Sequence, residues 1–167
     1  MKLTNLFVGI GLALPFTIWA QSDIKSTAPE GYLSRGIAMY GSHNYQGSID
    51  QLSHMLALPS SAEMTQQAKY YIALSHFQSG DPACLAYLKK YLEEYPFSLS
   101  SPDVRATLAD YYFYTGKFGE ALTQYSLVNE NAFNSDRRED IIYRKAYSEL
   151  RLANYQEAKN GFQKLAG

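Results

Sequence analysis

The stretch ADYYFYTGKFGEAL, residues 109–122, places four consecutive aromatic side chains before a Thr-Gly-Lys turn. Around it, Leu108, Tyr112 and Thr115 recur at spacings of four and three, the period at which side chains share one face of an α-helix. Leu122 begins the same pattern after the turn. No segment of the chain alternates for long with the period of two that is typical of strands. The stretch therefore predicts two short helices joined by a tight turn, in an all-α chain.

The same pattern occurs four times along the sequence, over residues 32–56, 70–96, 107–128 and 141–165. The segments align on small residues. In the first half of each segment these are Gly36, Ala73, Ala109 and Ala146, and in the second half they are Ser48, Cys84, Ala121 and Ala158. Within each series the separation is 36 or 37 residues. Two series in phase at one period predict a helical repeat, in which neighbouring hairpins stack because a lone hairpin cannot bury its apolar face. We expect the small residues to lie where two helices come close, and the large aromatic residues to fill the space between successive hairpins.

The domain organisation follows from this period. We expect a repeat domain over residues 29–167, with units of about 29–62, 63–99, 100–135 and 136–167. Signals for helix starts occur at the corresponding places. Ser60 and Asp136 each precede a Glu by three residues, which is the spacing of a capping box. Ser101 precedes a Pro and an Asp, which favours a helix cap followed by a first turn.

The first twenty residues are of a different kind. Lys2 is the only charged residue among them, and the apolar run LFVGIGLAL, residues 6–14, is followed by Pro15 and by FTIWA. This order is typical of a secretory signal peptide, which predicts a signal over residues 1–20, cleavage after Ala20 and a short linker over 21–28. We expect an exported or periplasmic protein. The alternative is an N-terminal anchor in the inner membrane, although the uncharged stretch 3–20 is short for a span.

These residues resemble the tetratricopeptide repeat, especially in exported bacterial proteins of the Bacteroidetes type. That family places small residues on both helices of each hairpin, as the two series above do. It also has a Gly-Asp-Tyr-like turn, matched by Gly80-Asp81 and Gly116-Lys117-Phe118, and a closing Tyr-Pro, matched by Tyr95-Pro96. The position that the family fills with Trp is unfilled here, and the period is longer than the family's common one. The sel1-like repeat is the nearest rival.

The resemblance implies a right-handed α-solenoid whose first helices line a concave groove that binds peptides. Carried over to this chain, the groove is aromatic and apolar, with Asp110 and Arg151 among its inward positions. It lacks the cluster of Lys, Asn and Arg that some relatives use to bind a terminal carboxylate, so we expect no such mode. The alternative is that some of these rings pack on the next hairpin and do not line the groove. The candidate groove residues are Tyr40, Tyr70, Phe77, Phe113, Tyr114, Tyr143 and Tyr147.

The sequence contains few features that are expected of an enzyme or of a nucleic-acid-binding protein. The 15 Lys and Arg residues are scattered and balanced by 16 Asp and Glu residues, so no basic surface is expected to meet a phosphate backbone. The three His residues do not have the spacing of metal ligands, and no phosphate-binding loop or nucleophile motif is present. Cys84 stands at a small-residue position, which favours packing. Arg137 and its charged neighbours are interpreted as a solvated helix face. We expect no enzyme, cofactor or metal.

The sequence is thus interpreted as a non-enzymatic interaction protein of the cell envelope, with a protein or peptide partner. One alternative is an assembly subunit that associates through its C-terminal end, because FQKLAG, residues 162–167, has an apolar face and no capping helix after it. The other interpretation of the same open end is that the chain is the N-terminal part of a longer array. A further alternative is a module accessory to an enzyme.

Overall fold

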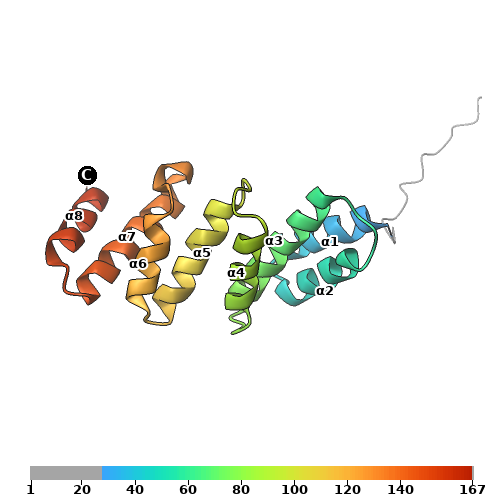
Figure 1. The fold of residues 1–167 in the computed structure, drawn as a ribbon, viewed down its shortest axis with the longest axis horizontal. Helices are drawn as coiled ribbons and strands as arrows, with labels where there is room; N and C mark the ends of the chain where they lie inside the picture. The colour runs from blue at the N-terminus through green and yellow to red at the C-terminus, as the bar shows by residue number, and fades with distance from the viewer. Residues whose placement is uncertain (1–27, 167) are drawn as a thin grey trace, which may run out of the picture.

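The computed structural model describes residues 28–166 and contains in that range eight α-helices, one short 3-10 helix and no strand (Figure 1). The predicted all-α class is confirmed. The predicted signal peptide 1–20, residues 21–27 of the linker and Gly167 lie outside the described residues. The elements are α1 (Pro29–Gly41), α2 (Tyr45–Leu56), α3 (Ala62–Gln78), α4 (Cys84–Glu94), α5 (Ser101–Tyr114), α6 (Phe118–Ser126), η1 (Glu130–Ala132), α7 (Ser135–Arg151) and α8 (Tyr155–Leu165). Within residues 28–166 no helix has the length and apolar character needed to cross a membrane.

The helices form an elongated row that follows the order of the chain (Figure 1). Each helix packs against the next one in sequence, and the odd-numbered helices also contact one another in succession, α1 with α3, α3 with α5 and α5 with α7. Contacts are therefore local along the row. The division of the chain into four repeat units, by contrast, stays a prediction.

Four tight turns have the same geometry, and they follow α1, α3, α5 and α7. After α5, the N–H of Gly116 donates to the carbonyl of Phe113 (3.0 Å), and the N–H of Lys117 donates to that of Tyr112 (2.8 Å). This pair of bonds closes a Schellman motif, which needs a residue in the left-handed region after the helix. The other three turns contain the same two bonds. The left-handed residues are His43 (φ +62°), Gly80 (+72°), Gly116 (+73°) and Ala153 (+62°), and they recur every 36 or 37 residues, as the small residues do.

The helix starts differ from the sequence signals by one or two residues. Ser61, not Ser60, caps α3, because its Oγ accepts the backbone N–H three residues further on. Asn134, not Asp136, caps α7 in the same way. Ser101 is already the first residue of α5 and makes no cap bond. Side chains of Ser, Asn and Asp compete for these positions on nearly equal terms, so the choice among neighbours is made by the preceding loop.

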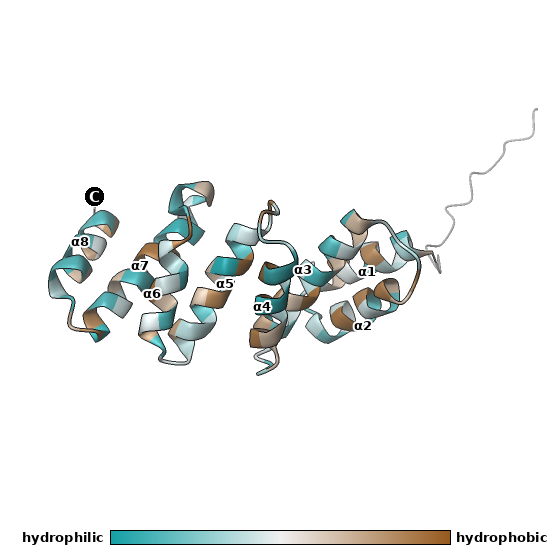
Figure 2. Cartoon of the chain, in the orientation of Figure 1, coloured by the Kyte–Doolittle hydropathy of each residue, from teal (hydrophilic) through white to brown (hydrophobic). Residues whose placement is uncertain are grey.

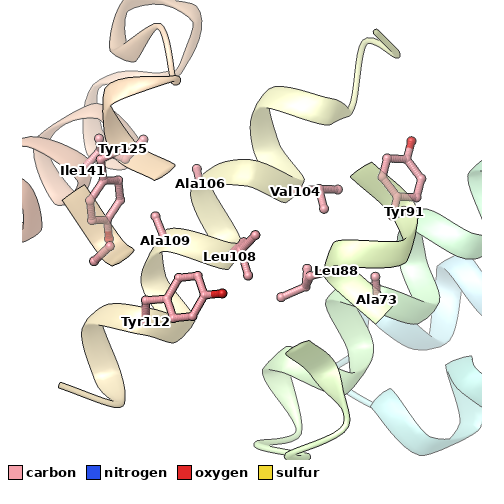
Figure 3. Close-up of a cluster of buried hydrophobic side chains, with 11 residues drawn as sticks. Ala73, Leu88, Tyr91, Val104, Ala106, Leu108, Ala109, Tyr112, Tyr125 and Ile141 are labelled. Atoms are coloured by element: carbon pink, nitrogen blue, oxygen red, sulfur yellow. The ribbon is translucent and has the colours of Figure 1, made fainter. Parts of the chain in front are cut away.

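The core runs along the row as two clusters of buried side chains. One lies among α1, α2 and α3 and includes Leu33, Leu52 and Ile72. The larger one extends from Ala73 on α3 to Ile141 on α7 (Figure 3). In Figure 3, Val104 and Leu108 of α5 point toward Leu88 and Tyr91 of α4, whereas Ala106 and Ala109 face Tyr125 and Ile141. Helix α5 is therefore buried on both sides, and it holds the middle of the molecule together.

All eight small residues of the two series are buried. Gly36 shows why size matters there, because a Cβ at this position would meet Cγ of Leu52 on α2 at 2.5 Å. A similar close approach occurs between α7 and α8. There a Cβ on Gly161 would lie 2.6 Å from Cβ of Ala146, so Gly161 is a close-contact residue that the alignment did not single out. Helices that approach this closely leave room only for hydrogen or a methyl group.

Candidate binding surface

A buried carboxylate organises the middle of the molecule. Asp110 lies in the third turn of α5 with its side chain only 4% exposed. It is an acceptor for three groups. Arg137 on α7 contacts Oδ2 at 2.7 Å, Arg144 on α7 contacts Oδ1 at 2.8 Å, and the hydroxyl of Tyr125 on α6 donates to Oδ1 at 2.6 Å. The two arginines are seven residues apart, two helical turns, so they project from one face of α7. One carboxylate thus connects three helices.

The charges of this cluster are matched locally. Arg144 also contacts Asp140, one turn earlier on α7, at 3.0 Å. Burial on its own lowers the pKa of Arg144. The charge of Asp110 and its hydrogen bond raise that pKa by more than burial lowers it, so the guanidinium stays protonated. Burial, followed by the negative charge of Asp110, raises the pKa of the Tyr125 hydroxyl. That group therefore remains a neutral donor. With two carboxylates and two guanidinium groups, the cluster carries no net charge.

This cluster borders a hollow of about 640 Å³. We call it the ion-lined hollow. It lies among α3, α5, α7 and the turn that leads into α4. Its apolar wall is formed chiefly by Phe77, Tyr111 and Tyr114, and its polar wall includes Asp110, Arg137, Asp140 and Arg144. Arg144 lies over the Tyr114 ring, with Cζ 5.4 Å from the ring centroid. The hollow therefore offers flat rings beside guanidinium groups that are already neutralised.

A second hollow of about 490 Å³ adjoins the first, and Tyr114 lines both. We call it the ring hollow. Edge-to-face contacts set its rings, with Phe113 5.6 Å from Tyr114, 6.0 Å from Phe118 and 5.5 Å from Tyr147, between centroids. Such contacts hold rings at fixed angles, because the positive edge of one ring meets the negative face of the next. Its lining residues are Phe113, Tyr114, Gly116, Phe118, Tyr143, Tyr147 and Arg151.

Arg151 is a cation held by rings. Its Cζ lies 4.7 Å from the centroid of Phe118 and 5.8 Å from that of Tyr147, and its NH1 donates to the Tyr147 hydroxyl at 3.3 Å. Among the residues that the structure describes, it has no carboxylate partner. The ring hollow is thus edged by a positive charge whose position is fixed by aromatic faces and whose remaining donors contact no carboxylate within residues 28–166.

The seven predicted groove residues fall into two groups. Phe77, Phe113, Tyr114, Tyr143 and Tyr147 line the two adjoining hollows. Tyr40 and Tyr70 lie in neither hollow. Both rings pack on Tyr71, with centroids 5.2 Å and 4.9 Å away, and the Tyr70 hydroxyl donates to Asp103 at 2.8 Å. Burial and the charge of Asp103 raise the pKa of Tyr70, so this tyrosine remains a neutral donor to that carboxylate.

The sequence interpretation missed the ion cluster. Arg137 was expected on a solvated face, but its side chain is only 23% exposed and bends toward Asp110. A signal was available in the sequence. Asp110 follows Leu108 and Ala109 and precedes the aromatic run, so a buried carboxylate there needs cations, and Arg137 and Arg144 have the right spacing to supply two.

Two side chains of types that often act in catalysis, His76 and Cys84, are held by local packing and hydrogen bonds. Nδ1 of His76 contacts Asp81 at 2.8 Å, and the ring stacks on Tyr87 with centroids 4.0 Å apart. The backbone N–H of Ala83, and then His76, lower the pKa of Asp81, which holds the start of α4. Cys84 is buried, and burial raises the pKa of its thiol. No three His, Cys, Asp or Glu side chains gather as metal ligands within the described range.

No known protein-family model matches this sequence, and no curated protein is significantly similar to it. The features that bear on function are therefore those of the chain itself: four equivalent turns, a neutral ion cluster connecting α5, α6 and α7, and two adjoining hollows with aromatic walls.

Proposed function

We propose that this chain is an exported, non-enzymatic interaction protein of the bacterial cell envelope that binds a peptide segment of a partner protein. In this proposal the eight helices form four hairpins of a right-handed α-solenoid similar to tetratricopeptide repeats. Support comes from the four Schellman turns and from the small residues, which share one period. Support also comes from the packing of each odd-numbered helix on the next, because stacked repeats contact only their neighbours.

The observation that carries the proposal is the surface formed by the ion-lined hollow and the ring hollow. Side by side, the two offer a continuous row of rings from Phe77 to Tyr147. Aromatic residues in open hollows are enriched where proteins bind peptides, since flat rigid rings bury much area at low entropic cost. The Asp and Arg side chains of the cluster in the ion-lined hollow are paired with one another. They therefore suit the fixing of a partner's orientation better than proton transfer or nucleophilic attack.

Tyr114 offers a direct test, because it lines both hollows and its side chain is 64% exposed. Peptides are selected from a phage-displayed random library on the purified protein, and their affinity is measured by isothermal titration calorimetry. We expect Tyr114→Ala to weaken the selected peptides by roughly tenfold or more, as for a central interface ring.

Tyr155 is the matched control for this test. It is 68% exposed, lies on α8 and lines neither hollow. Tyr155→Ala should leave the affinities unchanged. Crosslinking in the envelope, with a photoreactive residue at position 114 or at position 155, extends the comparison to natural partners. Selected peptides that bind both variants as tightly as the unchanged protein would contradict the proposed surface.

A further inference from the structure

The loop between α4 and α5 presents two large apolar side chains to solvent. Phe97 is 98% exposed and Leu99 is 102% exposed, which makes them the most exposed large apolar residues that the structure describes. In Figure 1 the loop rises above the adjacent ends of α4 and α5, and in Figure 2 part of it has the brown colour of hydrophobic residues. We call residues 95–100 the apolar knob. Exposed apolar side chains that project together are a feature of interaction surfaces.

The knob is held in place by hydrogen bonds to the core. Ser98, between the two exposed residues, shares its Oγ with the hydroxyl of the buried Tyr91 (3.0 Å) and with Oγ of Ser101 (2.8 Å). Ser101, in turn, donates to the carbonyl of Tyr95. Because Ser98 is bound inward, its neighbours Phe97 and Leu99 are kept outward. The exposure of both side chains is therefore built into the loop, and little ordering is needed before a partner can bind.

The charged residues that flank the knob in the sequence are acidic, while Lys69 lies over the ring of Tyr95 with Nζ 5.6 Å from its centroid. Residues 95–102 contain no charged side chain, and Glu93, Glu94 and Asp103 flank them. Glu94 pairs with Lys69 and Lys90, and Asp103 accepts the hydroxyl of Tyr70. Glu93 has no ion-pair partner within residues 28–166. An apolar tip beside a free acid suits a site made of rings with an adjacent free cation, whereas it does not suit an anionic lipid surface.

The ring hollow is such a site, but a molecule cannot bring its own knob to it. The knob precedes the first residue of α5, and the hollow begins at Phe113 and Tyr114, at the other end of that helix. The 14 residues of α5 separate the two by roughly 20 Å at the rise of an α-helix. Figure 1 shows the α4–α5 loop and the α5–α6 turn at opposite edges of the row. Only a second molecule can join them.

We propose that the apolar knob of one molecule inserts into the ring hollow of a second copy of this chain. Phe97 and Leu99 contact the rings, and Glu93 lies toward Arg151. The contact is heterologous, so each pair of molecules keeps one unused knob and one unused hollow and can extend into chains. A loop and a hollow make a small interface, and association is accordingly weak and dependent on concentration. This inference goes beyond the proposed function, since it requires no foreign peptide.

Sedimentation velocity over a series of protein concentrations tests the inference. The unchanged protein should show a weight-average sedimentation coefficient that rises with concentration. The double variant Phe97→Ser/Leu99→Ser should show no rise, and its circular dichroism and Tm should stay those of the unchanged protein, because both side chains are already in water. Arg151→Glu should weaken association by roughly tenfold or more, since it places two acids opposite each other. Tyr147→Ala is a second hollow variant that keeps the charge.

Mixing the variants distinguishes knob-in-hollow pairing from other modes. The knob variant retains its hollow, and Arg151→Glu retains its knob, so a mixture of the two monomeric variants should form heterodimers and nothing larger. A fluorescent label on one variant reports them in the same experiment. The inference is overturned if the unchanged protein stays monomeric, if the knob variant associates as the unchanged protein does, or if the mixture stays monomeric while the unchanged protein associates. Each of these results leaves Tyr114-dependent peptide binding standing, because that test measures peptide affinity and not self-association.

Discussion

Asp110 is the residue on which the middle of the molecule depends most. It is an acid in a helix that is otherwise buried through small, aliphatic and aromatic side chains, and its charge is balanced by Arg137 and Arg144 from the neighbouring hairpin. Paired buried charges add little net stability compared with apolar residues, but removal of one member leaves the others desolvated and unmatched. The cluster therefore acts mainly by fixing how α5, α6 and α7 sit against one another.

We predict that Asp110→Ala lowers the free energy of unfolding by about 3–5 kcal/mol, because two arginines and the Tyr125 hydroxyl then lose their shared acceptor. Urea unfolding followed by circular dichroism measures the change. Asp140→Asn is the control. That carboxylate also contacts Arg144, but its side chain is 57% exposed, and its loss should cost about 0–1 kcal/mol. Similar losses for the two variants would show that burial does not govern the cluster.

The sequence predicted which small residues are buried better than it predicted which charged residues pair. The small residues could be found because their period repeats, and all of them are buried. The inward turn of Arg137 could not be found in that way, because it occurs once and depends on how far α7 is rotated about its axis. Arg138, the next residue, would take its place after a rotation of about 100°. Such rotations are set by packing between hairpins, which no local pattern records.

The turns within helix pairs are the most regular elements of the fold. All four use a Schellman motif with one left-handed residue, but only two of them have Gly there. His43 and Ala153 adopt the same conformation with a Cβ, which costs about 1–2 kcal/mol relative to the right-handed region. The motif is thus imposed at these two positions by the helices on either side, and not by the residue itself.

This difference gives a reciprocal prediction. Gly116→Ala should lower the free energy of unfolding by about 1 kcal/mol, and through the backbone alone, since a Cβ there would meet no atom within 4 Å. Ala153→Gly should raise it by about 0.5 kcal/mol, because relief of the left-handed strain exceeds the added freedom of the unfolded chain. Urea midpoints at constant m-value measure both. A loss of stability on Ala153→Gly would mean that this turn is not strained.

Element types followed from the sequence more readily than element ends. The period of three and four residues predicted helices, and the described chain has helices alone. The starts of α3 and α7 were misplaced by one and two residues, because Ser60 and Ser61, or Asn134 and Asp136, are similar as caps. The local sequence offers both choices. The path of the incoming loop decides between them, and that path depends on the hairpin before it.

The two core clusters meet in α3, which contributes Ile72 to one and Ala73 to the other. Contacts elsewhere run only between successive helices and between successive odd-numbered helices. A molecule with this pattern can open from one end while the other end stays folded, since few side chains link distant hairpins. The α1–α2 end is tied to the rest through α3, and the α7–α8 end through the Asp110 cluster and the larger core cluster.

We predict that Leu52→Ala speeds hydrogen exchange mainly in α1 and α2. Leu52 is fully buried and packs where Gly36 leaves space, so its truncation should cost about 2–5 kcal/mol locally. Amides of α5 and α7 should keep their protection, as measured by native-state exchange with mass spectrometry. Ile141→Ala, in the larger cluster, is the matched control and should give the opposite pattern. Equal acceleration throughout the chain would indicate one cooperative unit.

The Schellman turns also make the two edges of the row unequal in their tolerance of added sequence. At the turn edge, the connections 42–44, 115–117 and 152–154 consist of the motif alone, and 79–83 adds two residues after it, so a residue inserted within the motif would break its bonds. At the other edge, the connections 57–61, 95–100 and 127–134 differ in length and conformation without disturbing the helices. Affinity tags, reporter domains or new recognition loops should therefore be inserted at that edge, with 127–134, the longest connection, as the first site for such engineering.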